Sequence, residues 1–362
     1  MSALKDYFSE DYLDSVAATL DGTRLRCPDA LRDLKPDLAE LELKDRVNAI
    51  ADRIVEFAEL DFPELMSELL VLLPEEKAFE DTHTLGQRHI FEGFGAWPLC
   101  SIVERHGLAH WEHSFSAMHR LTKAFSAEFA IRPFLLEDTE RAITCLTPLV
   151  LDRSEHVRRW VSEGTRPRLP WGKSVPALKD YRSEVLALLE SLKFDPSEYV
   201  RRSISNHLND LTREDPELVK STLERWQQDG VDERLIRHAL RGLVKSGDPG
   251  ALTILGFGAV DVEVRSFALD AEVIRVGDQV EIHADFVVDG PAVVDYVVEF
   301  PGAVRVSTKV FKWKHVEAGE HQVKKKHSFK PISTRRYYEG SGRFSLQING
   351  EIVGVASFEL KV

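Results

Sequence analysis

Glu163 occupies a position that the local helix pattern does not explain. It lies at the end of a predicted helix, directly before Gly164, where the negative end of the helix dipole disfavours a carboxylate. A fixed carboxylate can stabilise a cation that develops beside it and can help to hold a water molecule in place. The alternative is an ion pair with Arg159, one helical turn earlier. The position of Glu163 alone is compatible with both interpretations.

Two further carboxylates stand in comparable surroundings. Glu128 interrupts an apolar helical run in FSAEFAIRPFL (125–135), which predicts an acid at the edge of the core or one that is half-buried. Asp210 follows Asn206 by four residues, and Asn206 corresponds to Glu163 in a second copy of the same motif. Asp210 is therefore expected on the same helix face as Asn206 or just beyond the helix end. Glu128, Glu163 and Asp210 are the candidate acids.

An internal repeat positions these candidates. DRSEHVRRWVSE (152–163) and DPSEYVRRSISN (195–206) match at seven positions with an offset of 43 residues, which is typical of HEAT-type helix pairs. We expect an Asp to cap each helix and a Glu to be its third residue, namely Asp152 with Glu155 and Asp195 with Glu198, and Pro196 to be the first residue of the second helix. The copies differ at Trp160 and Glu163, which correspond to Ser203 and Asn206. A weaker third copy spans 232–248, and stacked repeats form a concave surface for a long ligand.

The segment that follows Glu163 combines arginine, proline and tryptophan, in GTRPRLPWG (164–172). Arg166 and Arg168 are suited to bidentate phosphate contacts, and Trp160 and Trp171 can present apolar faces to a sugar or a base. The alternative is a rigid loop between helices that buries its tryptophans.

The charge of the chain is unevenly distributed. The formal net charge of −13 argues against nucleic-acid binding when it is taken as one figure. However, residues 153–173 contain six Lys or Arg residues against two acids, and a second basic stretch, 309–336, includes Lys324, Lys325 and Lys326. These stretches are candidates for contact with a polyanion, and solvated faces are the alternative.

The apolar periodicity divides the chain into two parts. Up to about residue 256 apolar residues recur at helical spacing, as in Val185, Leu188, Leu189 and Leu192. From about residue 260 they alternate, in VEIHADFVV (280–288), VVDYVVEF (293–300) and GRFSLQI (342–348). We therefore predict a multidomain chain, α then β: an α-solenoid of HEAT-like repeats over 1–256 and an immunoglobulin-like β-sandwich over 257–362. The second part has no cysteine, which excludes an inter-sheet disulfide.

Three motifs carry a family resemblance. SAEFAIRPFL, VRRWVSEGTRPRLPWG and ISNHLNDLTREDPE resemble motifs of the AlkC branch of the AlkC/AlkD DNA alkylation-repair glycosylases, over most of residues 80–256. The resemblance implies double-stranded DNA with alkylated bases as the partner, and an immunoglobulin-like domain as in some members. It implies catalytic roles for Glu128 and Glu163, with Asp210 as a third acid. The predicted DNA-binding residues are Arg159, Trp160, Arg166, Arg168, Trp171, Lys324, Lys325 and Lys326.

The implied reaction is hydrolysis of the N-glycosidic bond of a cationic base, such as 3-methyladenine or 3-methylcytosine, without base flipping. The sugar gains positive charge as the bond breaks, and a base that is already cationic leaves without a general acid. One carboxylate about 4 Å from that cation contributes up to roughly 4 kcal/mol at an effective dielectric of about 20, or nearly a thousandfold in rate. A base that stays stacked avoids the few kcal/mol that extrusion costs.

A non-catalytic repeat scaffold is the alternative function. It would bind DNA or protein through the same concave face, and Glu163 would then only be paired with Arg159. Release of 3-methyladenine from alkylated DNA distinguishes this scaffold from a glycosylase.

A metal enzyme is a weaker alternative, prompted by His106, His110 and His113. Gly107 weakens the helix that would carry them, and no Asp or Cys pattern completes a site, so no metal is expected. The sequence has neither a Walker-type loop nor a GxGxxG turn, so no cofactor is expected.

The sequence predicts a soluble, cytoplasmic protein. Its N-terminus lacks a basic segment followed by an apolar run, and no stretch approaches the roughly 20 apolar residues that span a bilayer. Cys27, Cys100 and Cys145 are widely separated, and we expect reduced, structural thiols. We also expect a monomer.

Overall fold

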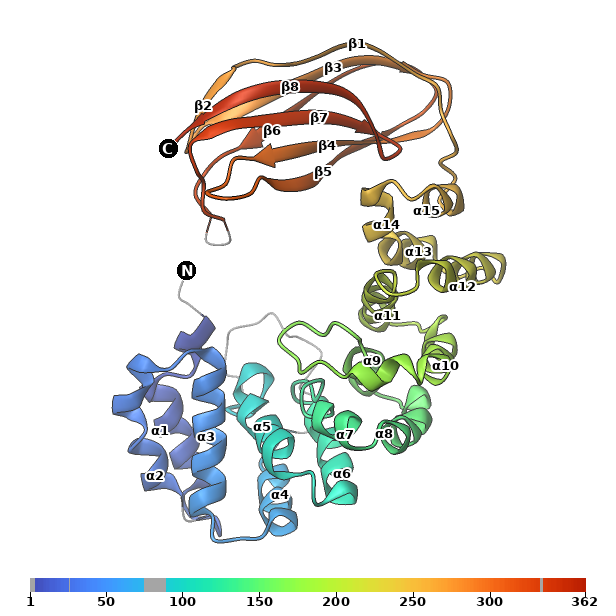
Figure 1. The fold of residues 1–362 in the computed structure, drawn as a ribbon. Coiled ribbons are helices and arrows are strands. Elements are labelled where there is room, and N and C mark those ends of the chain that lie inside the picture. The colour runs from blue at the N-terminus through green and yellow to red at the C-terminus, as the bar shows by residue number, and fades with distance from the viewer. Residues whose placement is uncertain (1–3, 26, 75–88, 333–334) are drawn as a thin grey trace. The chain divides into compact units, whose positions relative to one another are not determined.

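The computed structural model describes residues 4–25, 27–74, 89–332 and 335–362. Helices occupy the first part of the chain and strands the last, which confirms the predicted fold class (Figure 1). The α-helices are α1 (Glu10–Leu20), α2 (Pro28–Arg32), α3 (Leu43–Phe57), α4 (Phe62–Val71), α5 (Trp97–His106), α6 (Trp111–Thr122), α7 (Arg132–Glu137), α8 (Thr139–Leu146), α9 (Glu155–Gly164), α10 (Arg182–Leu192), α11 (Glu198–Leu211), α12 (Pro216–Gln228), α13 (Glu233–Ala239), α14 (Arg241–Ser246) and α15 (Pro249–Ile254). The 3-10 helices are η1 (Leu4–Tyr7), η2 (Lys35–Glu40), η4 (Gly93–Ala96), η5 (Thr147–Leu151) and η6 (Pro176–Lys179).

The chain divides into two compact units. Unit 1 is Met1–Asp210 and unit 2 is Leu211–Val362, so α12–α15 belong to the same unit as the strands. The last helix ends at Ile254 and the first strand begins at Val262, so the predicted change from helix to strand near residue 256 lies between them. The predicted domain limits, 1–256 and 257–362, stay a prediction of which parts of the chain fold as separate domains.

The helices of unit 1 follow the apolar periodicity of the sequence. In α10, Val185, Leu188, Leu189 and Leu192 are all buried, as the three- and four-residue spacing predicts. The charged and polar residues between them lie on the other face of the helix. Burial of this stripe, at roughly 1.5–3 kcal/mol for each large side chain, is the main force that holds such a helix in place.

The two matching helices begin later than the repeat pattern predicts. α9 starts at Glu155 and α11 starts at Glu198. Asp152 and Asp195 lie ahead of these helices, where each accepts a hydrogen bond from the backbone N–H of the serine two residues later, at 2.8 and 2.9 Å. The predicted capping boxes, and the position of Pro196 inside the helix, are therefore wrong. Each Asp closes a turn that leads into its helix.

The residues shared by the two copies hold the repeat together. Arg158 and Arg201 occupy matching positions, and each donates from Nη1 to the carbonyl oxygens of the turn before its own helix, including those of Asp152 and Asp195. Arg158 also forms a bidentate pair with the Asp195 carboxylate, at 2.6 and 3.0 Å, which links the first copy to the second. These matched positions therefore stabilise the repeat by hydrogen bonds and an ion pair.

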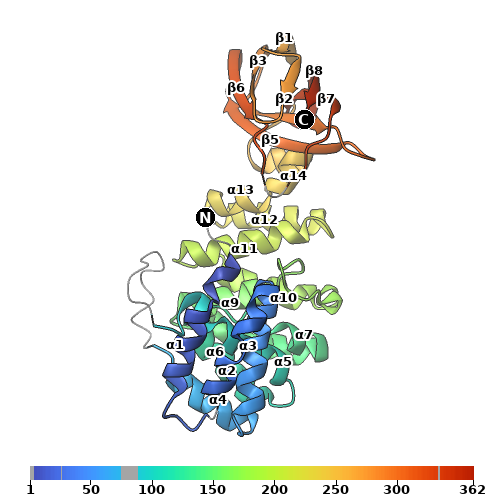
Figure 2. The same ribbon diagram turned by 90° about the vertical axis from the view of Figure 1, so that its left-hand side faces the viewer.

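Unit 2 ends in two sheets that face each other (Figure 2). The strands are β1 (Val262–Leu269), β2 (Val273–Arg275), β3 (Gln279–Val288), β4 (Ala292–Phe300), β5 (Ser307–Val316), β6 (Gly319–Ser328), β7 (Gly340–Ile348) and β8 (Glu351–Lys361). One sheet has the order β1-β3-β6 and the other β2-β8-β7-β4-β5. All pairings are antiparallel except that of β2 with β8.

The sandwich core follows from the alternation of the sequence. In β3 every second residue from Val280 to Val288 is buried, and Phe286, Phe329 and Phe344 have no exposed surface. The three alternating segments of the sequence lie in β3, β4 and β7, as predicted. β4 departs from alternation, because α15 and the residues after it cover its second face at Val293.

Two glycines in contact join α14 to the sandwich. Gly247 (φ 76°) follows α14, and Gly350 (φ 87°) lies between β7 and β8. A Cβ atom added to Gly350 would lie 2.0 Å from the Cα of Gly247, so only glycine allows this approach. Gln347 Nε2 donates to the carbonyl oxygen of Lys245 beside this contact, at 3.2 Å. The last helices and the sandwich are therefore packed backbone to backbone.

The cysteines of the described chain are free thiols. Cys27 and Cys100 are buried and Cys145 is partly buried. Burial raises the pKa of Cys27 to about 11 and also raises that of Cys100, so both thiols are protonated at neutral pH. Separately, no helix among the described residues has the length and apolar character that crossing a membrane requires.

Candidate functional site

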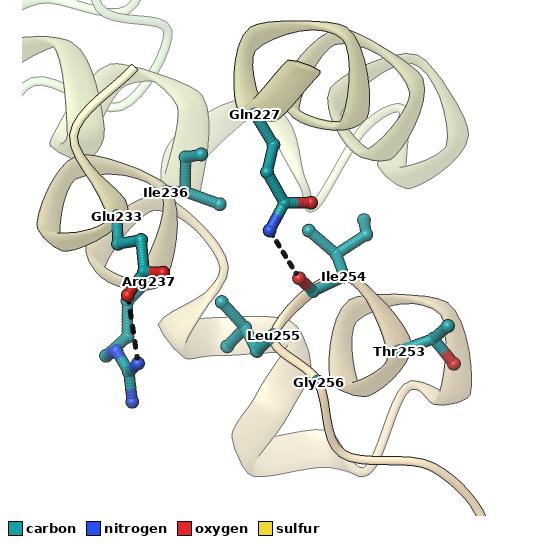
Figure 3. Close-up of a pocket in the computed structure, with 8 residues that line it drawn as sticks. All are labelled: Gln227, Glu233, Ile236, Arg237, Thr253, Ile254, Leu255 and Gly256. Carbon is teal, nitrogen blue, oxygen red and sulfur yellow. Dashed lines mark hydrogen bonds and ion pairs between the residues drawn. The ribbon is translucent and has the colours of Figure 1, made fainter. Parts of the chain in front are cut away.

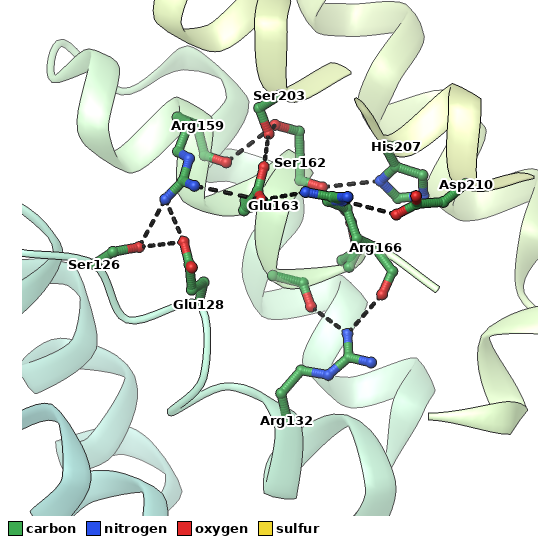
Figure 4. A network of polar contacts seen from close by, with 12 residues as sticks. Ser126, Glu128, Arg132, Arg159, Ser162, Glu163, Arg166, Ser203, His207 and Asp210 are labelled. Carbon is green, nitrogen blue, oxygen red and sulfur yellow. Dashed lines mark hydrogen bonds and ion pairs between the residues drawn. The ribbon is translucent and has the colours of Figure 1, made fainter. Parts of the chain in front are cut away.

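Five charged side chains of unit 1 form a continuous series of ion pairs (Figure 4). Glu128 pairs with Arg159, whose Nη2 also lies 3.4 Å from Glu163 Oε1. Arg166 Nη1 donates to the same oxygen of Glu163 at 2.6 Å, and Arg166 Nε donates to Asp210 Oδ2 at 2.8 Å. We call these five residues the acidic network. It contains three carboxylates against two guanidinium groups and has a carboxylate at each end.

The network draws on three parts of the fold. Glu128 lies in the turn between α6 and α7, and Asp210 lies near the end of α11. Arg159 and Glu163 are one turn apart on α9, which places them on the same helix face. Arg166 lies in the turn that leaves α9, where its backbone N–H donates to the Glu163 carbonyl oxygen at 3.2 Å. The structure thus brings all three sequence-predicted acids together.

Glu163 is the central carboxylate and is only 5% exposed. Burial alone would raise the pKa of Glu163, but the guanidinium groups of Arg159 and Arg166 and a hydrogen bond from Ser203 outweigh it and hold this pKa below its usual value. Glu163 is therefore ionised at neutral pH. Glu163 is thus both paired with Arg159 and part of a larger fixed network of carboxylates, so the two interpretations of its position do not exclude each other.

Arg159 fixes the orientation of both glutamates. Its Nη1 donates to Ser126 Oγ at 2.9 Å, and Ser126 Oγ donates to Glu128 Oε2 at 2.8 Å. Its guanidinium carbon lies 5.1 Å from the centre of the Tyr199 ring. Ser126 and Tyr199 were not among the site residues predicted from the sequence, although Tyr199 stands where the first copy of the repeat has a histidine.

A buried arginine holds the loop after α9. Arg132 has no exposed surface, and it donates to the carbonyl oxygens of Gly164, Arg166 and Lys173 at 2.8, 2.9 and 2.8 Å. Burial, with a smaller contribution from Arg166, lowers the pKa of Arg132 to about 10, so it remains charged at neutral pH. Arg132 thereby fixes the backbone that carries Arg166 (Figure 4), and its bond to Lys173 holds the loop just after Trp171.

Trp160 is a core residue in this structure. Its side chain has no exposed surface, its Nε1 donates to the Ala127 carbonyl oxygen at 3.1 Å, and its ring packs beside Phe115. A ring without exposed surface cannot contact DNA as it stands. Trp160 therefore positions the segment that carries Glu128 in this structure, and its contact with DNA stays a prediction.

Trp171 has the opposite environment. It is 61% exposed, and its backbone has a φ of 64°, in the left-handed region that a bulky residue seldom adopts. Its ring is nearly parallel to that of the buried Trp97, with an interplanar angle of 7° and centroids 6.4 Å apart. Lys44 Nζ donates to its carbonyl oxygen at 3.0 Å. An exposed ring in a strained, supported backbone is a candidate contact surface.

The two arginines of the loop also differ. Arg166 is 7% exposed, and its guanidinium is engaged by Glu163 and Asp210. In this structure Arg166 therefore has an internal role, in which it holds two carboxylates, and its phosphate contact stays a prediction. Arg168 is exposed and keeps its predicted position on the surface.

The three lysines of β6 do not lie on one face. Lys324 and Lys326 are exposed, whereas Lys325 is half-buried and shares its face with the buried Val323. Lys326 lies opposite Glu281 of the adjacent strand β3. The basic run of the sequence therefore becomes two exposed lysines beside an acid.

The three histidines considered for a metal site have separate surroundings. His106 ends α5 and its Nε2 lies 3.1 Å from Asp52 Oδ1, while the His110 ring stacks on Phe62. His113 lies on α6 and is exposed. Within the described ranges, no group of three or more His, Cys, Asp or Glu side chains could hold a metal ion.

A hollow of about 330 Å³ lies among α12, α13 and α15 of unit 2 (Figure 3). Its lining residues are Gln227, Glu233, Ile236, Arg237, Thr253, Ile254, Leu255 and Gly256. The Gln227 amide donates to the Ile254 carbonyl oxygen at 3.0 Å, and Arg237 lies near Glu233. The polar side chains of this hollow thus have partners within the fold, and the acidic network offers the more reactive chemistry.

The chain is similar to known proteins over its whole length. Residues 263–362 match the family described as uncharacterised protein YhaZ, C-terminal Ig-like domain. The uncharacterized protein YhaZ of Bacillus subtilis (strain 168) is 33% identical over 375 residues, covering 99% of this chain and 100% of the relative. The solved structure of Pseudomonas fluorescens alkylpurine DNA glycosylase AlkC, bound to DNA containing an abasic site analog, matches with a TM-score of 0.90 and 31% identity, over 100% of both chains.

The family resemblance of the three motifs is therefore confirmed by matches that extend beyond them. The fold agrees along the full chain, and the family model covers almost the whole of the strand-rich segment. This chain belongs to the AlkC branch of the AlkC/AlkD family of HEAT-like-repeat glycosylases, in the form that has a C-terminal immunoglobulin-like domain.

Proposed function

We propose that this chain is a DNA glycosylase that removes cationic alkylated bases, such as 3-methyladenine and 3-methylcytosine, from double-stranded DNA. The acidic network carries the proposal, because it fixes three carboxylates in a small, largely buried volume. Its excess of carboxylates over guanidinium groups suits it to a substrate that gains positive charge. The full-length similarity to a DNA-bound glycosylase supports DNA as the partner.

The carboxylates would act by electrostatics. As the N-glycosidic bond breaks, the sugar becomes cationic, and a carboxylate about 4 Å away contributes up to roughly 4 kcal/mol at an effective dielectric of about 20. This corresponds to nearly a thousandfold in rate for one group. Glu163, with Glu128 and Asp210 on either side of it, is the carboxylate that we assign to the developing cation and to the attacking water.

The arginines of the network serve this chemistry by keeping the carboxylates in place. A glutamate as buried as Glu163 would otherwise tend to take up a proton and lose its charge. With Arg159 and Arg166 beside it, Glu163 stays ionised before the substrate arrives, so no reorganisation is needed during the reaction.

The leaving group accounts for the selectivity. A base alkylated on a ring nitrogen is already cationic and departs without protonation, so a neutral base is spared even if it is bound. The acidic network contains no amine, which favours hydrolysis over a covalent amine intermediate, as in a monofunctional glycosylase. We propose that the base stays stacked in DNA, which avoids the cost of extrusion.

The exposed residues of the predicted set are the candidate DNA contacts. The Trp171 ring offers an apolar face, and Arg168 offers a guanidinium for the phosphate backbone. Lys324 and Lys326 are exposed in the sandwich. Because phosphate contacts release counterions, we expect binding to weaken steeply as salt increases.

Base release tests the proposal directly. Purified protein is incubated with methylated DNA, and released 3-methyladenine is measured for the parent and for the Glu128→Gln and Glu163→Gln variants. Glu198→Gln is the matched control, because Glu198 is an exposed acid on α11 that is not in the network. We expect losses of about a hundredfold or more for the two network variants and none for the control.

The possible outcomes separate the two functions. No release by the parent would favour the non-catalytic scaffold. Release that both network variants leave undiminished would remove the catalytic role from Glu128 and Glu163 but keep the glycosylase.

A further inference from the structure

Ser203 contacts the central carboxylate of the acidic network from the second copy of the repeat. Its hydroxyl is buried on α11 and donates to Glu163 Oε2 at 2.7 Å. Ser203 corresponds to Trp160 of the first copy. A tryptophan at this position would occupy the space of the hydroxyl, so the small residue is what lets α11 reach the carboxylate.

A second serine stands behind Ser203. Ser162 Oγ lies 2.6 Å from Ser203 Oγ, and it has no exposed surface. The Glu163 carboxylate can only accept, so Ser203 uses its one hydrogen toward Glu163 and accepts from Ser162. Ser162 shares its one hydrogen between Ser203 Oγ and the Arg159 carbonyl oxygen, which lies 3.0 Å from Ser162 Oγ. The share directed at Ser203 polarises the Ser203 hydroxyl toward Glu163.

The backbone of Ser162 is held by a second residue of α11, the helix that carries Ser203. His207 lies one turn after Ser203 on α11, and its Nδ1 donates to the Ser162 carbonyl oxygen at 2.9 Å. Burial is the main cause that lowers the pKa of His207 to about 4, so the ring is neutral at neutral pH. A neutral ring adds an orienting hydrogen bond without placing another cation beside Glu163.

The two oxygens of Glu163 have different partners. Oε1 faces Arg166 and Arg159, whereas Oε2 accepts from the Ser203 hydroxyl. A hydroxyl group orients an oxygen without cancelling its negative charge. Oε2 is therefore the oxygen of Glu163 that faces a neutral donor and no guanidinium, and we assign it to the cationic sugar or the attacking water.

We propose that Ser203, supported by Ser162, is a positioning residue that orients Glu163 Oε2 and adds a hydrogen bond to its charged form. The inference rests on the proposed function, since the carboxylate it positions is the one assigned to catalysis. The charged or titratable groups around Glu163 are Arg159 and Arg166, Glu128 from the turn before α7, Arg132 from α7, and Tyr199, His207 and Asp210 from α11. Ser203 acts on the reaction only through Glu163.

The rate of base release against pH tests this role. For Ser203→Ala we expect kcat to fall about tenfold, the value of one hydrogen bond to a charged group. We also expect the acid limb of the profile to move to higher pH, because the charged form of Glu163 has lost a donor. Ser203→Thr keeps the hydroxyl and should restore much of the loss.

Ser205→Ala is the matched control. Ser205 lies on the same helix, is 1% exposed and donates to the Arg201 carbonyl oxygen at 2.9 Å, so its loss disturbs α11 without touching Glu163. Equal kcat losses in Ser203→Ala and Ser205→Ala, with an unmoved acid limb in both, would reduce Ser203 to a structural residue.

A double variant separates this inference from the proposed function. In a Glu163→Gln background, Ser203→Ala should cause little further loss, because the two residues act as one unit. A full tenfold loss in that background would overturn the inference. If the parent released no base, the pKa of the Glu163 carboxyl would still be measured by ¹³C NMR, and an unchanged value in Ser203→Ala would also overturn it.

Discussion

The exposed ring of Trp171 rests almost parallel on the buried ring of Trp97. The buried ring supports the exposed one, although the backbone of Trp171 is in the left-handed region. The outer face of Trp171 is thereby held ready for a partner before any partner binds. An aromatic face of this kind contributes to binding mainly because its position is fixed in advance.

Replacement of Trp171 should separate binding from stability. We predict that Trp171→Gly weakens DNA binding by roughly tenfold, since Trp is a typical interface anchor. The free energy of unfolding should stay within about 1.5 kcal/mol of the parent, because relief of the left-handed backbone offsets part of the lost ring contact. Fluorescence titration with DNA and urea unfolding measure the two quantities. Unchanged affinity together with a large loss of stability would show that the ring is structural.

The internal role of Arg166 predicts a large effect on stability. In Arg166→Met, the buried Glu163 and Asp210 carboxylates lose a shared guanidinium, and we expect a loss of about 3–5 kcal/mol at neutral pH. Arg168→Met is the control, because Arg168 is in the same loop but exposed, and it should change stability by less than about 0.5 kcal/mol. Urea unfolding measures both, and equal effects would contradict the assignment.

The sandwich should lose stability in mild acid because of His327. Its ring is 6% exposed, its Nδ1 lies 3.1 Å from Tyr296 Oη, and burial is the main cause that lowers its pKa to about 4 from an ordinary 6.5. Between these pH values the unfolded chain binds a proton that the native ring does not, so stability falls as pH decreases from 6.5 toward 4. The contribution of His327 is on the order of 3 kcal/mol.

His327→Phe removes this titration. We expect the difference in unfolding free energy between variant and parent to shift in favour of the variant as the pH falls from 7 to 4.5. Urea unfolding at several pH values measures it. A difference that stays constant over that range would exclude His327 as the source of the acid sensitivity.

The contact of Gly247 with Gly350 predicts that the junction of α14 with the sandwich tolerates no side chain. In Gly350→Ala the new Cβ would meet backbone, which cannot move as a flexible side chain would. Gly277→Ala is the matched control, since Gly277 also has a positive φ, of 106°, but has open space around it. We expect a loss of about 1 kcal/mol for the control and at least twice that for Gly350→Ala, measured by thermal unfolding. Similar losses would show that only backbone conformation matters at Gly350.

The sequence allowed the order of helices and strands to be predicted, because periodicity is a local property of the chain. The buried row of α10 and the alternation of β3 follow directly from it. The burial of β4 on both faces could not be predicted, because it depends on Val293 meeting α15 and Phe257. The starts of α9 and α11 were also misplaced, since an Asp that closes a turn has the same local signature as an Asp that caps a helix.

The site could be predicted from the sequence only where its features depend on local information. Glu163 stood out because its residue type conflicts with the end of its own helix, which is local information. The burial of Trp160 and Arg166 depends on packing against other elements, so their residue types alone suggested surface roles. Ser203 was visible as a difference between the two copies, but a small residue in place of a large one attracted no chemical interpretation.

The acidic network takes members from α9 and α11, the helices that carry the two copies of the repeat, and this couples its chemistry to the spacing of these helices. Slippage of α11 along its axis by one turn, about 5.4 Å, would separate Ser203 from Glu163 and Asp210 from Arg166. The 33 residues between α9 and α11 (165–197) therefore set the position of α11 relative to α9. Insertions in that segment should be tolerated only where they form an added loop and leave the two helices at their present positions.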